Sequence, residues 1–565
     1  MRLPLRYLLL PFLAASVHLP AAAQYVIYVD DGATGANNGT SWSDAYTDLR
    51  TALVHADPIF QVWVAAGTYK PTTTGDRNES FGLPNRVTVY GGFDGTETSL
   101  DERAGLFDAT ILSGDLAGDD GPGFANVSDN SFHVAVGIGS LDGFTVVGGN
   151  ADGSHGTEPN GGGLLIGAWG PVHPTIANCT FRANRARHFG GAVCLYPADA
   201  TVFSNCVFAD NRAGDEGGAV WTSGMDEGAR FERCRFVGNV SGGGGGAVRS
   251  QTWEAFLSCE FVGNRADGAA SFGGGALYGG SLRILQCTFS ANSAVGSDRG
   301  GGAVLTGGDS FLRGSILWGN ADGSGLDDRE QIHVWSGARY MSADHCDIQG
   351  WTGQSFPGRA MLHGDPAFVD ADGADDVAGT ADDDLRLAPG SPCVDTGGVR
   401  SSMEPLRPLD LDGRPRFVDS LACDGSGVLD MGARERQAID GTTNTCPQPP
   451  TSLGFPAEIS APCVVRAGDG PVTITVAPVH SSTGFLWFGS QSASVPFGVD
   501  TRCVGGELHR IADLTRIGDT LTIDLDLADP IAAALVPGSS WHFQAIFRDA
   551  GALRLSDATT ITFRD

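Results

Sequence analysis

Carboxylates dominate the residues of this chain that could carry chemistry, and the densest group lies between residues 370 and 384. Carboxylates crowded into one loop repel one another unless a cation or water separates them, and hard oxygen ligands suit Ca²⁺. The loop does not follow the EF-hand pattern, because Gly373 stands at its fourth position and Ala381 at its twelfth. Two interpretations stay open, a structural calcium site and a solvated acidic loop. The candidate ligands are Asp370, Asp372, Asp375, Asp376, Asp382, Asp383 and Asp384.

A second group of residues could act on a polysaccharide. Arg235 and Glu260 are expected to point outward from equivalent positions of successive repeats, and Asp215 and Glu216 lie near a turn. A lyase would need Ca²⁺-binding acids with an arginine or lysine base, whereas a glycosidase needs two carboxylates about 5 to 9.5 Å apart. The other interpretation is structural, because Arg235 and Glu260 would also form an ordinary ion pair between neighbouring strands.

The elements that position these residues are repeated along the chain. The phrase Cys-x-Phe-x-x-Asn occurs five times, with its cysteines 27, 28, 25 and 28 residues apart. A second phrase, Gly-Gly-Ala followed by Val or Leu, falls once in each period. Two motifs locked to one period predict a solenoid. The motif positions are Cys179, Cys206, Cys234, Cys259 and Cys287; Phe181, Phe208, Phe236, Phe261 and Phe289; and Asn184, Asn211, Asn239, Asn264 and Asn292.

The spacing inside each repeat predicts one strand with a single apolar face. Cys and Phe lie two positions apart, so their side chains point to the same side of a strand. Such a strand cannot bury its apolar face alone, but coils stacked about 4.8 Å apart build a continuous parallel sheet and core. The asparagine is expected to turn the chain off the sheet and to form a ladder with its equivalents. The stacked cysteines are expected to be buried thiols that pack as small hydrophobes, because they lie side by side.

Composition limits the compartment and the partners. The chain carries a formal net charge of −30 and a single lysine, Lys70, which makes nucleic acid and anionic membranes unfavourable partners. Residues 1–23 predict a signal peptide that is cleaved near Ala23 and Gln24. No later run approaches the roughly 18 apolar residues of a membrane span. We therefore expect a secreted or cell-surface protein without a transmembrane segment after the signal peptide.

Cysteines outside the ladder are candidates for disulfides, because the chain is expected to be exported and contains 12 cysteines. The expected pairs are Cys393 with Cys423 and Cys463 with Cys503. Cys446 could compete for either pair.

The two repeated phrases resemble the FxxN and GGA(I/L/V) repeats of the chlamydial polymorphic outer membrane proteins, and more generally the coils of secreted bacterial β-helix proteins. The stretch from 25 to about 150 and the phrases between 365 and 435 are similar to the opening and closing segments of such bacterial proteins. This resemblance implies a right-handed parallel β-helix. It implies no activity.

The sequence as a whole predicts an all-β protein, a right-handed parallel β-helix followed by a small C-terminal β-sandwich. The function expected is non-enzymatic, adhesin-like or glycan-binding, with a polysaccharide or a host or neighbouring cell surface as partner. The alternative is a polysaccharide lyase or glycoside hydrolase. No cofactor is expected apart from the candidate calcium. The expected divisions are a signal peptide (1–23), a cap with the first coils (24–140), the repeats (141–365), an acidic loop and closing module (366–437), a linker (438–455) and the β-sandwich (456–565).

Overall fold

The structure is a computed structural model of the chain, and it describes only part of the 565 residues. The expected signal peptide and linker lie outside the described residues. The described residues are 25–103, 105, 107–167, 173–196, 200–224, 228–268, 273–295, 300–322, 328–335, 340–388, 390–398, 409–416, 429–436, 458–460, 464–466, 472–477, 484–497, 500–517, 520–525, 540–549 and 552–564.

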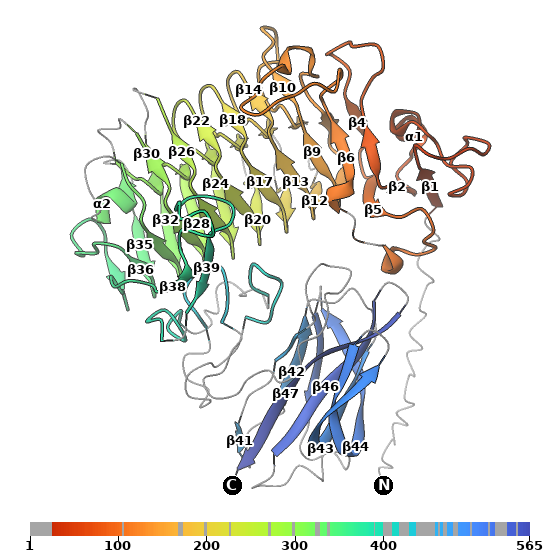
Figure 1. Ribbon diagram of the computed structural model, residues 1–565. Coiled ribbons are helices and arrows are strands. Elements are labelled where there is room, and N and C mark those ends of the chain that lie inside the picture. The colour runs from red at the N-terminus through yellow and green to blue at the C-terminus, as the bar shows by residue number, and fades with distance from the viewer. Residues whose placement is uncertain are drawn as a thin grey trace, which may run out of the picture.

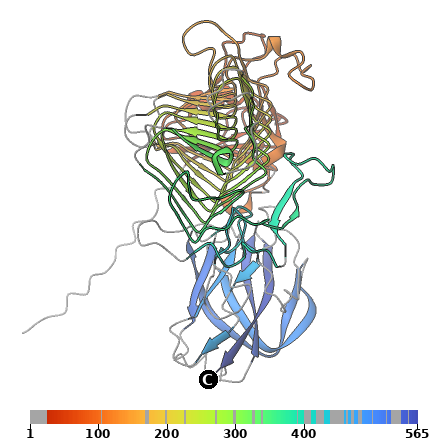
Figure 2. The ribbon, with the colours of Figure 1, turned by 90° about the vertical axis from the view of Figure 1, so that its left-hand side faces the viewer.

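The repeats form a right-handed parallel β-helix, as the sequence predicted, and its coils stack in chain order (Figure 1). Four parallel sheets run along the stack, and seen from the end that carries the helix α2 (Asp328–Gln331) the coils superpose (Figure 2). The largest sheet, called sheet A here, has 12 strands. They are β1 (Tyr25–Val29), β2 (Phe60–Ala65), β5 (Thr88–Phe93), β8 (Ser140–Asp142), β12 (Thr175–Ala177), β16 (Val202–Ser204), β20 (Arg230–Glu232), β24 (Trp253–Leu257), β28 (Ser281–Leu285), β32 (Ser310–Arg313), β35 (Met341–Asp344) and β37 (Gly358–Arg359).

Sheet B follows sheet A in each coil and contains the Cys-x-Phe strands. It has 10 strands. They are β3 (Gly67–Tyr69), β6 (Thr110–Ser113), β9 (Thr145–Val147), β13 (Thr180–Arg182), β17 (Val207–Ala209), β21 (Arg235–Val237), β25 (Glu260–Val262), β29 (Thr288–Ser290), β33 (Ile316–Trp318) and β36 (Asp347–Ile348).

Sheets C and D complete each coil. Sheet C, with 9 strands, contains β4 (Phe81–Leu83), β7 (Ala135–Gly137), β11 (Leu164–Ile166), β15 (Val193–Leu195), β19 (Val220–Thr222), β23 (Val248–Ser250), β27 (Leu277–Gly279), β31 (Val304–Thr306) and β34 (Ile332–Val334). Sheet D, with 6 short strands between sheets B and C, contains β10 (Asn150–Ala151), β14 (Arg185–Ala186), β18 (Arg212–Ala213), β22 (Val240–Ser241), β26 (Arg265–Ala266) and β30 (Ser293–Ala294).

The interior is organised by columns of identical side chains. The ladder phenylalanines stack nearly parallel, with ring centroids 4.7 Å apart between Phe208 and Phe236 and 4.6 Å between Phe261 and Phe289. These distances match the spacing of neighbouring strands. The ladder cysteines lie beside them, fully buried, and Cys206 Sγ lies 3.3 Å from the carbonyl of Ile176 in the preceding coil. One-sided strands therefore share a single continuous core.

The asparagines form a hydrogen-bonded ladder inside the solenoid, and they differ from the expectation in one respect. Asn211 Oδ1 accepts hydrogen bonds from the backbone N–H and the Nδ2 of Asn184, at 3.0 and 3.2 Å. The left-handed residue that turns the chain is the one before the asparagine, such as Ala183 or Asp210. The asparagine is buried and bonds the neighbouring coil, because its amide must satisfy backbone groups that the turn leaves without a partner.

The solenoid begins with a helix that covers its first coils. The helix α1 (Leu49–His55) starts after Asp48, whose side chain accepts the N–H of Arg50. Leu49 and Leu53 join the solenoid core. Short helical turns follow at η1 (Leu100–Glu102), η2 (Phe107–Ala109), η3 (Val127–Asp129) and α2 (Asp328–Gln331).

The C-terminal strands are antiparallel apart from one parallel pair, and they form a separate β unit, which confirms the expected fold class. The strand β44 pairs with β43 along most of its length and with β45 through its last three residues, so it joins two sheets. The strands are β40 (Glu458–Ser460), β41 (Val464–Arg466), β42 (Val472–Ala477), β43 (Gly484–Phe497), β44 (Asp500–Ile517), β45 (Thr520–Leu525), β46 (Ser540–Asp549) and β47 (Ala552–Arg564). The expected domain boundaries stay a prediction.

Neither expected disulfide is tested by the described residues. Cys423, Cys446 and Cys463 lie outside them, and the side chain of Cys503 is not described. Cys393 is a buried thiol whose Sγ lies 3.2 Å from Asp347 Oδ2. Within the described part of the chain, no helix is long and apolar enough to cross a membrane.

Candidate functional site

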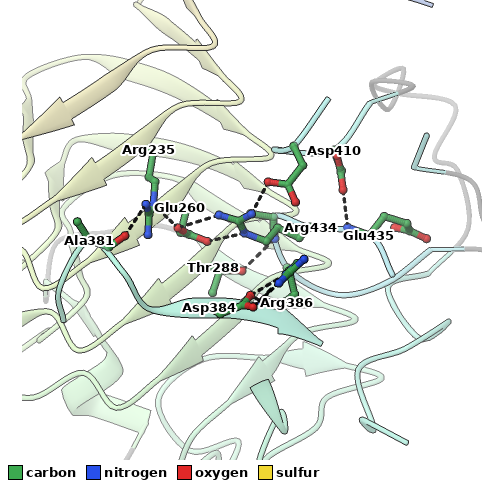
Figure 3. A network of polar contacts seen from close by, with 12 residues as sticks. Arg235, Glu260, Thr288, Ala381, Asp384, Arg386, Asp410, Arg434 and Glu435 are labelled. Carbon is green, nitrogen blue, oxygen red and sulfur yellow. Dashed lines mark hydrogen bonds and ion pairs between the residues drawn. The ribbon is translucent and has the colours of Figure 1, made fainter. Parts of the chain in front are cut away.

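The first candidate pair, Arg235 and Glu260, lies on sheet B beneath a segment that returns from the end of the solenoid (Figure 3). Arg235 Nε donates to Glu260 Oε1 at 2.6 Å, and Arg434 Nε donates to Glu260 Oε2 at 3.0 Å. Burial would raise the pKa of Glu260, but Arg434 and Arg235 outweigh it and hold the pKa below its ordinary value. Glu260 is 0% exposed, so the expectation that this pair faces outward toward a polysaccharide is wrong.

The acidic loop is part of the same returning segment. The strands β38 (Phe368–Asp370) and β39 (Asp384–Leu387) flank it as a hairpin, and Leu385 packs on Val237 and Val262 of sheet B. Its carboxylates accept bonds within the loop: Gly379 N–H donates to Asp383 Oδ2 at 2.8 Å and Thr380 Oγ1 to Asp382 Oδ1 at 2.6 Å. Calcium binding by this loop stays a prediction.

Another acidic cluster was not recognised in the sequence. Among the described residues, Asp115, Asp119 and Asp129 form a group of three carboxylates whose oxygens all lie within 4.8 Å of one another. Asp115 Oδ1 already accepts the N–H of Gly118, and Asp129 Oδ2 accepts the N–H of Ala117 at 2.8 Å. Asp115 and Asp129 therefore stabilise their own loop through these hydrogen bonds.

The other two candidates, Asp215 and Glu216, lie at the edge of sheet C, where both are paired. Asp215 Oδ2 lies 2.7 Å from His188 Nδ1, and Glu216 Oε2 lies 3.3 Å from Arg249 Nε. The candidate residues thus divide between two sheets and do not form one cluster.

A column of side chains that sequence analysis missed runs along the outer face of sheet C. It is formed by the residue that follows each Gly-Gly-Ala-(Val or Leu) phrase, because Val or Leu points inward and the next side chain points outward. The strand register places these residues side by side in successive coils. The sequence contained the signal for this column, because a variable residue directly follows the Val or Leu of each repeated phrase. The column contains Cys194, Trp221, Arg249, Tyr278 and Leu305.

An open groove of about 600 Å³ lies at the edge of this column. The Arg249 guanidinium stacks over the Tyr278 ring, 3.9 Å from its centroid. The same guanidinium forms an ion pair with Glu216. Trp335, which follows β34, is 36% exposed. The groove is lined by Arg249, Ser250, Gln251, Tyr278, Gly279, Gly280, Gly307 and Trp335.

Glycines form part of the groove lining, where sheet C turns into sheet A. A Cβ on Gly280 would lie 2.9 Å from the carbonyl oxygen of Thr252, so the close approach of two coils requires glycine here. A Cβ on Gly307 would meet only the Gly279 carbonyl, at 4.0 Å. The backbone is therefore exposed to a ligand at a position where a side chain would fit.

An apolar cluster continues the column toward the N-terminal coils. Leu165, Cys194 and Trp221 are buried together, and the Phe189 ring stacks on Trp221 with centroids 5.1 Å apart. Tyr196 stacks on the same indole and is 53% exposed. The outer face of sheet C is thus apolar and aromatic over several coils.

Glu254, in β24, is a titratable carboxyl on the inner side of the wall. Thr222 Oγ1 donates to its Oε1 at 2.5 Å, and the residue is 0% exposed. Burial raises the pKa of Glu254 to about 7, against the lowering effects of Thr222, Thr252 and Arg249. The described lining of the groove itself contains aromatic, arginine, amide and hydroxyl groups and no carboxylate. Such a surface can stack and donate hydrogen bonds, but it lacks a pair of acids.

No protein-family model and no curated protein matches the chain. Among solved structures, a pectate lyase Pel9A is similar at 14% identity and a TM-score of 0.40, over 73% of this chain and 96% of that one. The tailspike protein gp49 from Acinetobacter baumannii bacteriophage Fri1, a capsular polysaccharide depolymerase, is similar at 10% identity and a TM-score of 0.32, over 96% of this chain and 80% of that one. Similarity at this level carries no functional argument.

Proposed function

We propose that this chain is an extracellular glycan-binding protein that holds a sugar chain in the groove on sheet C. The observation that carries the proposal is the combination of Tyr278, Trp335 and Arg249 around one open groove with exposed backbone. Aromatic rings present an apolar face that packs on the C–H face of a pyranose, and the groove places polar groups beside that face. The adhesin-like role expected from the sequence belongs to the same proposal.

The polar side of the groove is held in place before any ligand arrives. Arg249 is fixed between Glu216 and the Tyr278 ring, so little side-chain entropy remains to be lost on binding. Ser250 and Gln251 contribute a hydroxyl and an amide at the same edge. These groups match sugar hydroxyls, which are both donors and acceptors.

Binding is favoured over cleavage by the placement of the acids. A glycosidase needs two carboxylates that flank the scissile bond. Glu216 is paired with Arg249, and Glu254 lies on the inner side of the wall. A lyase or hydrolase is the alternative, and the experiment must distinguish binding from cleavage.

The test exposes the purified full chain to a panel of neutral and acidic polysaccharides while retention, reducing ends and unsaturated products are recorded together. Retention without product supports the proposal, and product formation assigns the protein to the enzymes. Trp335→Ala should weaken retention about tenfold, because it removes the exposed ring. Gly307→Trp should abolish retention by filling the groove, since a side chain at this position meets no backbone clash.

The matched control is Tyr25→Ala. Tyr25 is 61% exposed and lies in β1, at the first rung of sheet A. Its loss should leave retention unchanged. Equal losses in Tyr25→Ala and Trp335→Ala would show that the groove is not the binding site.

A further inference from the structure

Four exposed arginines gather where sheet B turns into sheet D, away from the groove on sheet C. They are Arg182, Arg185, Arg187 and Arg212, called the arginine patch here. In the coil that begins at Cys179, all three outward positions around this corner are arginine, because Phe181, Asn184 and Ala186 take the inward positions. The patch is therefore a product of the alternation that builds the core.

Strand register brings the fourth arginine to the patch. Arg185 of β14 pairs directly with Arg212 of β18, so their Cα atoms lie about 4.8 Å apart. Arg187 lies two residues beyond Arg185, about 7 Å along the chain. Like charges at this separation repel each other, and the fold provides no compensation for that cost within the pair.

No described carboxylate neutralises the patch. Among the residues that the structure describes, none of the four arginines forms an ion pair. Asp152 is bound to Arg77 at 2.7 Å, and Asp215 to His188 at 2.7 Å. Asp210, the other acid of this corner, has its pKa raised by burial, whereas contact with a guanidinium would lower it. The chain has 36 basic and 66 acidic residues, so an uncompensated basic patch is unexpected on composition.

A further arginine on sheet D, in register with Arg185 and Arg212, does form an ion pair. Arg265 occupies the equivalent position in β26, and its Nε lies 2.5 Å from Asp267 Oδ1. An arginine in this column is therefore readily paired by the residue two positions later. The corresponding residues in the two patch coils are Arg187 and Gly214, which leave the charge of Arg185 and Arg212 open.

We infer that the arginine patch binds an anionic polysaccharide through its carboxylate or sulfate groups. A guanidinium donates two parallel hydrogen bonds to such a group, and this geometry favours arginine over lysine. Neighbouring arginines on successive coils offer several such contacts to one flexible chain. This site is separate from the proposed groove, and it would make the protein a binder of charged polymers at a second surface.

The narrowness of the patch favours a single polysaccharide strand over a membrane or a duplex nucleic acid. Surface charges act over about 8 Å at physiological ionic strength, so a strand lying on the patch experiences mainly local charge. A membrane or a duplex would also approach the surrounding surface of a molecule with a net charge of −30. A membrane or a duplex is therefore repelled by the surrounding acidic surface, whereas a single polysaccharide strand contacts only the arginine patch.

The test uses three polymers with the same backbone: dextran, carboxymethyl dextran and dextran sulfate, with duplex DNA as a fourth probe. The full chain should bind one or both charged dextrans more tightly than dextran or DNA, with affinity falling as salt is raised. The double variant Arg185→Gln/Arg212→Gln should bind the charged dextrans about tenfold more weakly. Arg265→Gln, the matched control in the same column, should bind within about twofold of the wild type.

Which charged dextran binds distinguishes a carboxylate ligand from a sulfate ligand. The inference is overturned if neither charged dextran binds better than dextran, if DNA binds more tightly than both, or if Arg265→Gln loses as much as the double variant. Trp335→Ala separates this site from the groove: unchanged binding of the charged dextran supports two sites, and a matching loss would overturn the separate site.

Discussion

At the scale of single residues, the interior of this solenoid holds titratable groups that water cannot reach. Glu254 is surrounded by Thr222 and Thr252, and its Oε2 has no hydrogen-bond partner among the described residues. A buried carboxyl without a cationic partner prefers its neutral form. The protonation of Glu254 therefore makes the stability of the fold depend on pH.

Glu254→Gln tests this coupling. The folded pKa of Glu254, about 7, lies above its ordinary value of 4.5. The contribution of Glu254 to the free energy of unfolding is therefore fully present below pH 4.5 and is lost as the pH rises through about 7, by roughly 3 kcal/mol in all. The glutamine variant, which does not ionise, should be more stable than the wild type at pH 8 and not at pH 4. Denaturant unfolding at both pH values measures this, and an identical pH dependence of the two proteins contradicts it.

The ladder cysteines should behave as inert core residues. Burial raises the pKa of the Cys179 thiol to about 12, so the reactive thiolate is absent at neutral pH. We expect a thiol-alkylating reagent to leave Cys179 and its four ladder equivalents unmodified in the native protein and to modify all five after denaturation. Peptide mass spectrometry reads out each site. Rapid native labelling of any ladder cysteine would show that the solenoid opens locally.

At the scale of elements, the asparagine ladder links each coil to the next. Asn239 Nδ2 donates to Phe208 O at 2.8 Å and to Asn264 Oδ1 at 2.9 Å, while its Oδ1 accepts from Asn211. All of these groups are buried. Because each partner lies in an adjacent coil, the ladder fixes the register of the whole stack.

Asn239→Leu should destabilise the protein by about 4 kcal/mol, because it leaves several buried donors and acceptors without partners. The measurement is the shift of the urea midpoint. Val240→Ala is the control on the same coil, where the half-buried side chain lies on the outer side of β22. It should cost about 1 kcal/mol or less. Equal costs for the two variants would mean that the ladder contributes packing only.

At the scale of the whole molecule, the segment that returns from the end of the solenoid is fastened to sheet B by buried charges. Arg434 donates to Glu260 (Figure 3) and also to Asp412. The N–H of Ala433 donates to Thr288 Oγ1 at 2.9 Å. Arg434 lies 174 residues beyond Glu260 in the chain. Removing one member of a buried ion pair is costly because the other charge stays buried.

Arg434→Ala should therefore loosen the returning segment by about 3 to 5 kcal/mol. Hydrogen exchange of β21 and β25 would rise, and proteolysis between 370 and 384 would accelerate. Arg386→Ala, which removes a partly exposed partner of Asp384, is the control and should cost about 1 kcal/mol or less. The double variant Glu260→Gln/Arg434→Gln should be milder than Arg434→Ala, because the fully buried Glu260 carboxylate is neutralised together with the arginine that faces it. If all three variants behave alike, the ion pairs do not fasten the segment.

The β-helix could be predicted from the sequence because its determinants are local and periodic. Cys179 and Phe181 point inward by strand alternation alone, and the same spacing in the next coil stacks them without any distant contact. The pattern could not show what covers the outside of the coils. Arg235 and Glu260 satisfied every local rule for an exposed pair, yet Arg434 from a far segment of the chain lies on them.

Tertiary structure alone also decided where the two proposed binding surfaces lie. Tyr278 and Trp335 are far apart in the repeat pattern, and they line one groove because the stack brings β27 and the end of β34 together. Arg185 and Arg212 meet for the same reason, through register between β14 and β18. A periodic sequence determines the inward face, since every coil repeats the same inward residues. The outward residues vary from coil to coil, and which surfaces they form depends on neighbours that only the folded stack brings together.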